Sequence, residues 1–292
     1  MLNKNYCLIT GASEGFGKAL ALECASRKMN LILVALPGPE LHYLADFIKR
    51  NHAVDVIAIE KDLCKEENCV SLFDEINALG LRLNMLINNA GIGSTMLFSE
   101  GSIQLYQKQI KLNILATTLV TRLFVDKLGK NSPSHILNVG SLSCFFFLAK
   151  KQVYGGTKSY IYFFSKSLRR ELQPEGIGVS VICPGGMNTN TSVILVNRAS
   201  NWLARLSVMN PEEVAPIAID GLLKGKEVII PGAINKFFLL LNNIIPAFLK
   251  KIITNRQMKA LSSASMESQL VPVETNPVFP IPFIKRSKII YS

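Results

Sequence analysis

The chain has 292 residues, of which 49% are hydrophobic, and it carries a formal net charge of +11. This length suffices for one large domain with its own core, and the hydrophobic content excludes a chain that is disordered throughout. The basic residues are mostly scattered and are not interleaved with aromatic side chains, so the charge does not indicate a nucleic-acid partner.

The six cysteines form no C-x-x-C pair, and none lies near a histidine at zinc-finger spacing. We therefore expect neither a disulfide scaffold nor a metal site, and instead reduced thiols in a cytoplasmic chain. The first residues lead directly into a strand-like run without the pattern of a cleaved signal peptide, which favours the same location.

Short apolar runs alternate with helical patterns along most of the chain. The expected strands occupy residues 6–10, 31–35, 54–59, 85–88, 135–139, 179–183 and 227–230. Helices are expected between them, among others at 17–28, 103–128 and 154–172. This alternation predicts βαβ units with right-handed crossovers. The fold class is therefore α/β, with a doubly wound parallel sheet of the Rossmann type.

The alternating pattern stops near Pro231-Gly232, which sets the expected domain boundaries. Residues 1–232 are expected to form a single Rossmann-type domain. Residues 233–260 are apolar with flanking lysines, which predicts an amphipathic, basic helical extension. Residues 261–292 are rich in Ser, Pro and Thr without clear periodicity, and we expect a disordered tail.

A glycine-rich turn follows the first expected strand and leads into a helix. It reads Thr10-Gly11-Ala12-Ser13-Glu14-Gly15-Phe16-Gly17. A pyrophosphate group needs backbone N–H groups close to it at the positive end of a helix, and glycines permit that approach. The candidate cofactor contacts here are Thr10, Gly11, Ser13, Glu14, Gly15, Phe16 and Gly17. The alternative is an ordinary glycine-rich turn.

Two further segments extend this candidate nucleotide site. Asn88-Asn89-Ala90-Gly91 follows the fourth strand, and the carboxyl ends of strands one and four flank the point where ligands bind in doubly wound sheets. Asn89, Ala90 and Gly91 are therefore candidate contacts. Asp62, with Leu63 beside it, follows the third strand and could meet the adenine edge. The alternative for Asp62 is a helix N-cap.

Tyr154 and Lys158 lie four residues apart, so their side chains would share one face of a helix. An ammonium beside a phenol should lower the phenol pKa from about 10, and Tyr154 could then pass a proton to or from a substrate oxygen. Ser141, after the fifth strand, could hold that oxygen against Tyr154. Asn113 could hold a water that links Lys158 to solvent. Taken singly, each residue also has an ordinary structural explanation.

In this order and spacing the motifs resemble those of the classical short-chain dehydrogenase/reductase family, over roughly residues 4 to 232. The matching motifs are T-G-A-S-E-G-F-G at 10–17, N-N-A-G at 88–91, Asn113, Ser141, Tyr154 with Lys158, and Pro184-Gly185 followed by Thr189.

This resemblance implies an oxidoreductase that transfers a hydride between a nicotinamide cofactor and a carbonyl or alcohol. It implies a catalytic tetrad of Asn113, Ser141, Tyr154 and Lys158, with Lys158 also binding the nicotinamide ribose. Pro184, Gly185 and Thr189 would lie at the nicotinamide end of the cofactor. It further implies a homo-oligomer, either a dimer or a tetramer.

The choice between NAD and NADP depends on the residues after the second strand. They are Ala35-Leu36-Pro37-Gly38, which include neither the acid that selects NAD nor a basic residue that selects NADP. Leu36 lies where the adenosine ribose should emerge. Glu14 stands where NADP users of this family often carry a basic residue, and a carboxylate should repel a 2′-phosphate. We expect NAD or NADP, with a slight preference for NAD.

The substrate is expected to be a small apolar molecule, such as a lipid-like carbonyl. The segment 187–209 should line the cleft and carries Val193, Ile194, Leu195, Val196, Trp202 and Leu203. Phe145, Phe146 and Phe147 lie near Ser141 in the sequence. The sequence does not choose among fatty-acyl, steroid-like and other apolar carbonyls.

Two other functions remain open at this stage. The chain could bind a nucleotide without catalysis, as a sensor or scaffold, although all four tetrad positions are present. Alternatively, the segment 234–258 has apolar residues at helical spacing bordered by lysines, and it could lie on an anionic membrane surface. The same segment could equally cover the substrate cleft or a subunit interface.

Overall fold

The computed structural model describes residues 4–189, 193–194 and 205–245. Within these residues, seven parallel strands form one sheet in the order β3-β2-β1-β4-β5-β6-β7. The strands are β1 Asn5–Thr10, β2 Asn30–Ala35, β3 Val56–Glu60, β4 Arg82–Asn88, β5 Ser134–Val139, β6 Ile177–Ile182 and β7 Val228–Ile229. This confirms the doubly wound parallel sheet predicted from the sequence.

Helices connect the strands. The α-helices are α1 Gly15–Ser26, α2 Pro39–Asn51, α3 Glu66–Ala78, α4 Ile103–Ile110, α5 Thr117–Lys130, α6 Gln152–Leu172, α9 Pro211–Leu223 and α10 Ala233–Ile244. The shorter segments are η1 Phe98–Glu100, η2 Lys111–Ala116, η3 Leu142–Cys144 and η4 Gln173–Glu175.

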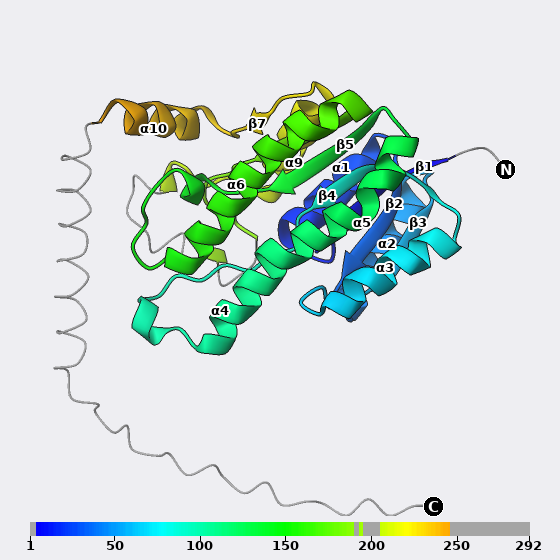
Figure 1. Ribbon diagram of the computed structural model, residues 1–292, viewed down its shortest axis with the longest axis horizontal. Coiled ribbons are helices and arrows are strands. Elements are labelled where there is room, and N and C mark those ends of the chain that lie inside the picture. Colours follow the sequence, from blue (N-terminus) through cyan, green and yellow to red (C-terminus); the bar gives the residue numbers. More distant parts are fainter. Residues whose placement is uncertain (1–3, 190–192, 195–204, 246–292) are drawn as a thin grey trace, which may run out of the picture.

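The sheet is covered on both faces, which explains why its strands are continuous apolar runs. Residues 31–35 of β2 are all buried, as are residues 6–10 of β1. On one face α1, α2 and α9 pack in a core with residues such as Leu20, Leu44 and Ile219. On the other face α3, α5 and α6 bury Leu72, Phe124 and Leu172. Figure 1 shows α5 and α6 running across this second face.

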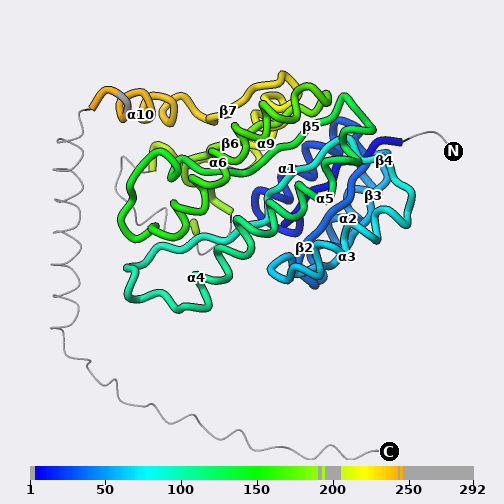
Figure 2. Tube along the Cα trace, in the orientation of Figure 1, coloured from blue at the N-terminus to red at the C-terminus, as the bar shows by residue number. Residues whose placement is uncertain are grey.

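The sheet divides into two halves between β1 and β4, with β1, β2 and β3 in one half and β4 to β7 in the other. Figure 2 shows β3, α2 and α3, blue to cyan, toward one end of the molecule and α6, green, toward the other. The order of strands reverses direction between β1 and β4. The carboxyl ends of these strands therefore flank the crevice where doubly wound folds bind ligands.

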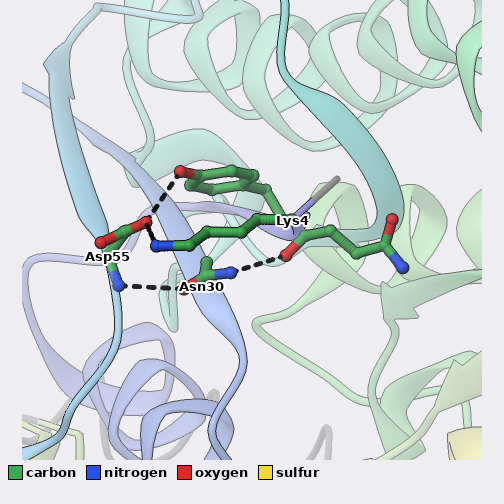
Figure 3. A network of polar contacts seen from close by, with 5 residues as sticks. Lys4, Asn30 and Asp55 are labelled. Carbon is green, nitrogen blue, oxygen red and sulfur yellow. Dashed lines mark hydrogen bonds and ion pairs between the residues drawn. The ribbon is translucent and has the colours of Figure 1, made fainter. Parts of the chain in front are cut away.

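A polar network closes the opposite, amino-terminal edge of the sheet (Figure 3). Asp55 accepts hydrogen bonds from Lys4 Nζ at 2.7 Å and Tyr6 Oη at 3.3 Å, and its backbone N–H donates to Asn30 Oδ1 at 3.0 Å. The Lys4 side chain lowers the pKa of the Asp55 carboxyl. Because Lys4 and Asp55 are exposed, the ion pair contributes little stability. The network links β1, β2 and the start of β3 at the edge away from the crevice.

The element boundaries differ from the sequence prediction in instructive places. The helix expected at 103–128 is divided, because residues Lys111–Ala116 form a π-helical turn between α4 and α5. The extension expected from residue 233 begins there as α10, beyond β7 (Figure 1). The remainder of the extension and the tail at 261–292 lie outside the described residues. In the part of the chain that the structure describes, no helix is long and apolar enough to cross a membrane.

Candidate active site

The turn between β1 and α1 is built for close backbone approach. Gly11 and Gly15 adopt φ values of +65° and +52°, in the left-handed region that favours glycine. A Cβ at Gly17 would collide with the carbonyl oxygen of Gly11. No side chain caps the first turn of α1, and Glu14 at the N-cap position is exposed. The first N–H groups of α1 are therefore available to an anion, which fits a pyrophosphate group.

The turn after β4 is joined directly to this glycine turn. Asn89 Nδ2 donates to the carbonyl oxygens of Thr10 and Gly11, both at 2.9 Å. The backbone N–H groups of Asn89 and Ala90 both donate to Thr10 Oγ1 at 3.0 Å. The structure thus brings Thr10, Gly11, Asn89 and Ala90 together, as expected for residues at the ends of β1 and β4.

Other predicted cofactor residues take more varied positions. Thr189 lies beside the glycine turn, since a Cβ at Gly15 would come within 3.0 Å of the Thr189 Cβ. Phe16 is buried in the core, so only its backbone faces the turn. Leu36 is 55% exposed beyond β2. Ser13 is half-buried in the turn.

Asp62 lies after β3, where it is neither buried nor a helix N-cap. Its Oδ1 accepts a hydrogen bond from the backbone N–H of Cys64 at 3.0 Å, which stabilises a turn before α3. The N-cap position of α3 is Lys65. The alternative that Asp62 is the N-cap of α3 is therefore wrong. Leu63, next to it, is buried in the core.

Asn113 lies in the π-helical turn and ties three segments together. Its Oδ1 accepts from the Ile92 N–H at 2.9 Å, while its Nδ2 donates to the Ile92 carbonyl and to Thr157 Oγ1, each at 3.0 Å. The Asn113 side chain is buried. A Cβ at Gly91 would lie 3.0 Å from Asn113 Oδ1 and 3.5 Å from Lys158 Nζ, so Gly91 keeps open the space between them.

Lys158 lies on α6 with its ammonium group buried. Lys158 Nζ donates to the Val139 carbonyl at the end of β5 at 2.7 Å, and it lies 5.8 Å from the centroid of the Tyr154 ring. Burial lowers the pKa of Lys158 from 10.5 to about 8. Because this pKa lies close to neutral pH, small changes in the groups around Lys158 can change whether the amine is protonated.

Tyr154 lies close to the Ser141 side chain, but the pKa of its phenol moves opposite to the prediction. Burial raises the pKa of Tyr154, and the nearby Ser141 side chain opposes this effect only in part. The expectation that Lys158 would lower the phenol pKa is therefore wrong. The physical reason is that loss of hydration penalises the phenolate more than its neighbours stabilise it. Tyr154 is therefore a protonated phenol at neutral pH.

Pro184 and Gly185 follow β6 and border the same region. The Pro184 carbonyl accepts from the Leu142 N–H at 2.8 Å, which joins the end of β6 to the turn that contains Ser141. A Cβ at Gly185 would lie 2.6 Å from the Ser207 carbonyl oxygen. Met187 pairs with Met209, so the ends of the predicted cleft segment are held together. Most of that segment, including Trp202 and Leu203, lies outside the described residues.

Sequence reasoning missed several contributors to the site. Thr157 joins Asn113 to α6 through its hydroxyl, and the Val139 carbonyl holds Lys158. In the sequence, a threonine between Tyr154 and Lys158 only weakly suggests a role in the site. A contact made by a backbone carbonyl cannot be recognised from the sequence. Cys144 and Cys183 also lie at this edge, with their sulfur atoms 3.9 Å apart.

Comparison with known proteins identifies the class of protein that this fold and site define. The short chain dehydrogenase family profile matches residues 5–198. The chain is 30% identical to the 3-oxoacyl-(acyl-carrier-protein) reductase FabG of Aquifex aeolicus over 218 residues, which is 73% of this chain and 87% of the relative. The chain belongs to the short-chain dehydrogenase family and is an oxidoreductase of that family.

Two solved structures resemble the whole chain more broadly. The bulky-bulky ketone specific alcohol dehydrogenase from Comamonas testosteroni has 25% identity and a TM-score of 0.70, covering 94% of this chain and 98% of that one. A short-chain dehydrogenase from Sphingobium yanoikuyae in complex with NADPH has 25% identity and a TM-score of 0.71, covering 95% of this chain and all of that one.

Proposed function

We propose that the enzyme transfers a hydride between nicotinamide and a carbonyl or alcohol, with Tyr154 as general acid and base. The observation that carries this proposal is the cluster at the carboxyl edge of the sheet. There the Ser141 side chain lies close enough to Tyr154 to influence its pKa, and the Lys158 ammonium lies beside the phenol ring. Ser141 comes from the turn that follows β5, and Tyr154 and Lys158 come from α6.

The residues present fit a dinucleotide cofactor. The uncapped first turn of α1 would hold the pyrophosphate, and Asn89 and Ala90 would border the adenosine side. Pro184, Gly185 and Thr189 would border the nicotinamide side. A bound reduced nicotinamide supplies a hydride to the carbonyl carbon.

Tyr154 would donate its proton to the carbonyl oxygen, since its raised pKa keeps the phenol protonated at neutral pH. Ser141 would hold that oxygen by its hydroxyl. Lys158, whose pKa is lowered to about 8, would stabilise the phenolate that remains and return the proton. Asn113 would hold the segment after β4 in place through its two bonds to Ile92.

The test is the variant Tyr154→Phe, compared with Tyr162→Phe on the same helix. Loss of the Tyr154 hydroxyl should lower turnover by about a hundredfold to ten-thousandfold and leave cofactor affinity unchanged. Tyr162 packs its ring edge-on against Phe145, and its replacement by phenylalanine keeps that contact. Turnover is measured by transfer of isotope-labelled hydride across a panel of ketones and alcohols, and affinity by calorimetric titration.

Near-normal turnover in Tyr154→Phe would overturn the assignment of the acid. Cofactor binding by the unaltered protein without hydride transfer to any member of the panel would favour the alternative of a silent nucleotide sensor. A loss of turnover in Tyr154→Phe that does not occur in Tyr162→Phe would indicate a chemical role of the Tyr154 hydroxyl. Equal losses in both variants would indicate altered packing of α6.

For the cofactor we favour NAD. Glu60 accepts hydrogen bonds from the Gly38 N–H at 3.1 Å and from His42 at 3.0 Å, and the Gly38 bond in particular lowers the pKa of the Glu60 carboxyl. Glu60 is therefore a carboxylate behind the segment where the adenosine ribose should emerge. Glu14 is exposed at the N-cap of α1, at a position where NADP users of this family often carry a basic residue, and together the two carboxylates should repel a 2′-phosphate.

For the substrate we favour a large apolar carbonyl. Phe147 is 94% exposed beyond η3, and Phe145 packs against Tyr162 of α6. Phe145 and Phe147 lie in the segment between η3, which Ser141 caps, and α6, which carries Tyr154. The Aquifex relative is named for a 3-oxoacyl substrate and the Comamonas structure for bulky ketones, which agrees with such a substrate.

For α10 we propose contact with an anionic lipid surface. Its polar face is turned to the body of the protein, because Asn235 is buried and Asn242 Nδ2 donates to the Phe145 carbonyl at 3.2 Å. The apolar residues Ile234, Phe237, Leu240, Leu241 and Ile244 are exposed. This arrangement favours residues 1–232 as the catalytic domain and 233–260 as an attached extension.

A further inference from the structure

Two thiols face each other beside the catalytic residues. Cys144 is the last residue of η3, and Cys183 follows the last residue of β6. Their sulfur atoms are 3.9 Å apart, although the residues are separated by 39 positions in the chain. Both belong to a small apolar cluster with Ile161 and Val181.

The two thiols differ in their access to solvent. Cys183 is fully buried, whereas Cys144 is half-buried in the part of the chain that the structure describes. The hydrogen bond with Cys144, together with burial, raises the pKa of Cys183 well above its usual value. Cys144 is therefore the thiol that a small oxidant reaches first, and Cys183 is placed to attack it next.

The backbone around these thiols belongs to the active-site turn. The Cys144 N–H donates to the Ser141 carbonyl at 3.1 Å. The Leu142 N–H donates to the Pro184 carbonyl at 2.8 Å. Any movement that brings the two sulfur atoms together therefore acts on the segment that holds Ser141 against Tyr154.

We propose that Cys144 and Cys183 form a reversible disulfide on exposure to a peroxide, and that this bond lowers turnover by displacing Ser141. In the first step the Cys144 sulfur takes one oxygen from the peroxide, giving a sulfenic acid and water. In the second step the Cys183 sulfur attacks the Cys144 sulfur and displaces a second water, with loss of the Cys183 proton. The thiols lose two electrons and two protons, and the peroxide is reduced.

The expected effect on turnover follows from the distance to be closed. A disulfide has sulfur atoms about 2.05 Å apart, so the turn carrying Cys144 must move toward β6 from the present separation of 3.9 Å. A misplacement of about 1 Å at a catalytic group can cost about a hundredfold in rate. We therefore expect at least a tenfold loss of turnover in the oxidised enzyme and full recovery with a dithiol reductant.

The experiment uses the full chain, first reduced and then treated with hydrogen peroxide. Digestion without reductant, followed by mass spectrometry, should recover a cross-linked pair of peptides containing Cys144 and Cys183. The variant Cys144→Ser should not form this link and should keep its turnover in peroxide. A matched control is Cys64→Ser, which removes another half-buried thiol and should leave both the link and the loss of turnover unchanged.

The cross-link is read independently of any activity, so its outcome does not depend on the proposed function. Absence of the 144–183 link after peroxide treatment would overturn the proposal, as would a dominant link between Cys7 and Cys24, which are both buried in one core cluster. Full turnover in the linked enzyme, or equal loss of turnover in Cys144→Ser, would overturn the proposed effect on Ser141.

Discussion

Burial acts on Tyr154 and Lys158 in opposite directions, and this sets their protonation in the free enzyme. The pKa of the phenol is raised and the pKa of the amine is lowered, because a poorly hydrated site penalises the charged form of each group. Both shifts favour neutral side chains. A phenol that keeps its proton suits donation to a carbonyl oxygen, and an amine with a pKa of about 8 can exchange its proton near neutral pH.

Lys158 should also leave a signature in the pH dependence of stability. Between pH 8 and 10.5 the unfolded chain binds a proton at this residue that the folded chain has released. The contribution of Lys158 to the free energy of unfolding therefore rises with pH in that window. Below pH 8 the full cost of burying the charged amine lowers the stability of the fold. Replacing Lys158 with methionine removes the effect, so the variant's free energy of unfolding relative to wild type should fall as the pH rises from 8 to 10.5. Chemical denaturation at several pH values measures this, and a constant difference would contradict it.

Cofactor preference should depend on the charge at Leu36. Leu36→Arg should raise catalytic efficiency with NADP relative to NAD, because guanidinium binds phosphate in a fork geometry. Leu36→Asp should do the opposite by accepting hydrogen bonds from the ribose hydroxyl. The combination of Leu36→Arg with Glu14→Lys should shift the ratio further than either change alone. The measurement is the ratio of kcat/KM with NADP to kcat/KM with NAD in each variant. If this ratio stays the same in all of them, the preference for NAD has no basis.

At the scale of elements, two segments depart from regular geometry where the site is built. The β1–α1 turn uses left-handed glycines, and the helix after β4 contains a π-helical turn at Asn113. Such turns widen the helix locally and often occur at functional positions. Here the π-helical turn carries Asn113 to Ile92 and Thr157, and so fixes the wall of the site to α6.

Glycine at position 17 should be required for folding as well as for cofactor binding. An alanine Cβ there would collide with the Gly11 carbonyl and lie 2.6 Å from Asn89 Nδ2, and backbone cannot move aside cheaply. Gly17→Ala should therefore cost about 1–3 kcal/mol of stability. Gly156→Ala is the matched control, since it lies within α6 with open space around it and should stabilise the fold by about 0.5–1 kcal/mol. The denaturant midpoints of both variants measure these changes. An unchanged midpoint in Gly17→Ala would contradict the close contact between positions 17 and 11.

Viewed over the whole molecule, α10 carries an apolar face that lies outside the core. Its exposed residues point away from the body while Asn235 and Asn242 face inward. A helix oriented in this way adds nothing to the core and is available to an external surface. The lysines that follow in the sequence, at positions 250, 251 and 259, would favour an anionic one.

The double variant Phe237→Glu with Leu241→Glu should abolish sedimentation with vesicles that contain phosphatidylserine. The control Tyr43→Glu alters another exposed aromatic residue, on α2, and should leave sedimentation unchanged. If α10 instead forms a subunit interface, as the expected dimer or tetramer allows, the double variant would lower the mass measured by light scattering. In that case the unaltered chain would not sediment with the vesicles.

Local sequence patterns were sufficient to predict the architecture and the family. Alternating apolar runs predicted the strands, because parallel strands covered on both faces have few other compositions available. The glycine turn, Asn89 and the Tyr154–Lys158 pair are local patterns whose spacing follows from a single turn or helix. Such patterns can be recognised without knowing what packs against them.

The tertiary structure decided the features that depend on segments distant in sequence. It placed Thr189 against Gly15, joined Thr157 to Asn113 and set Cys144 opposite Cys183. It also reversed the expected direction of the Tyr154 pKa shift, because burial depends on the whole fold whereas the four-residue spacing to Lys158 is local. Local spacing in the sequence carries the geometry of one helix or turn, and the hydration of a side chain depends on every element packed around it.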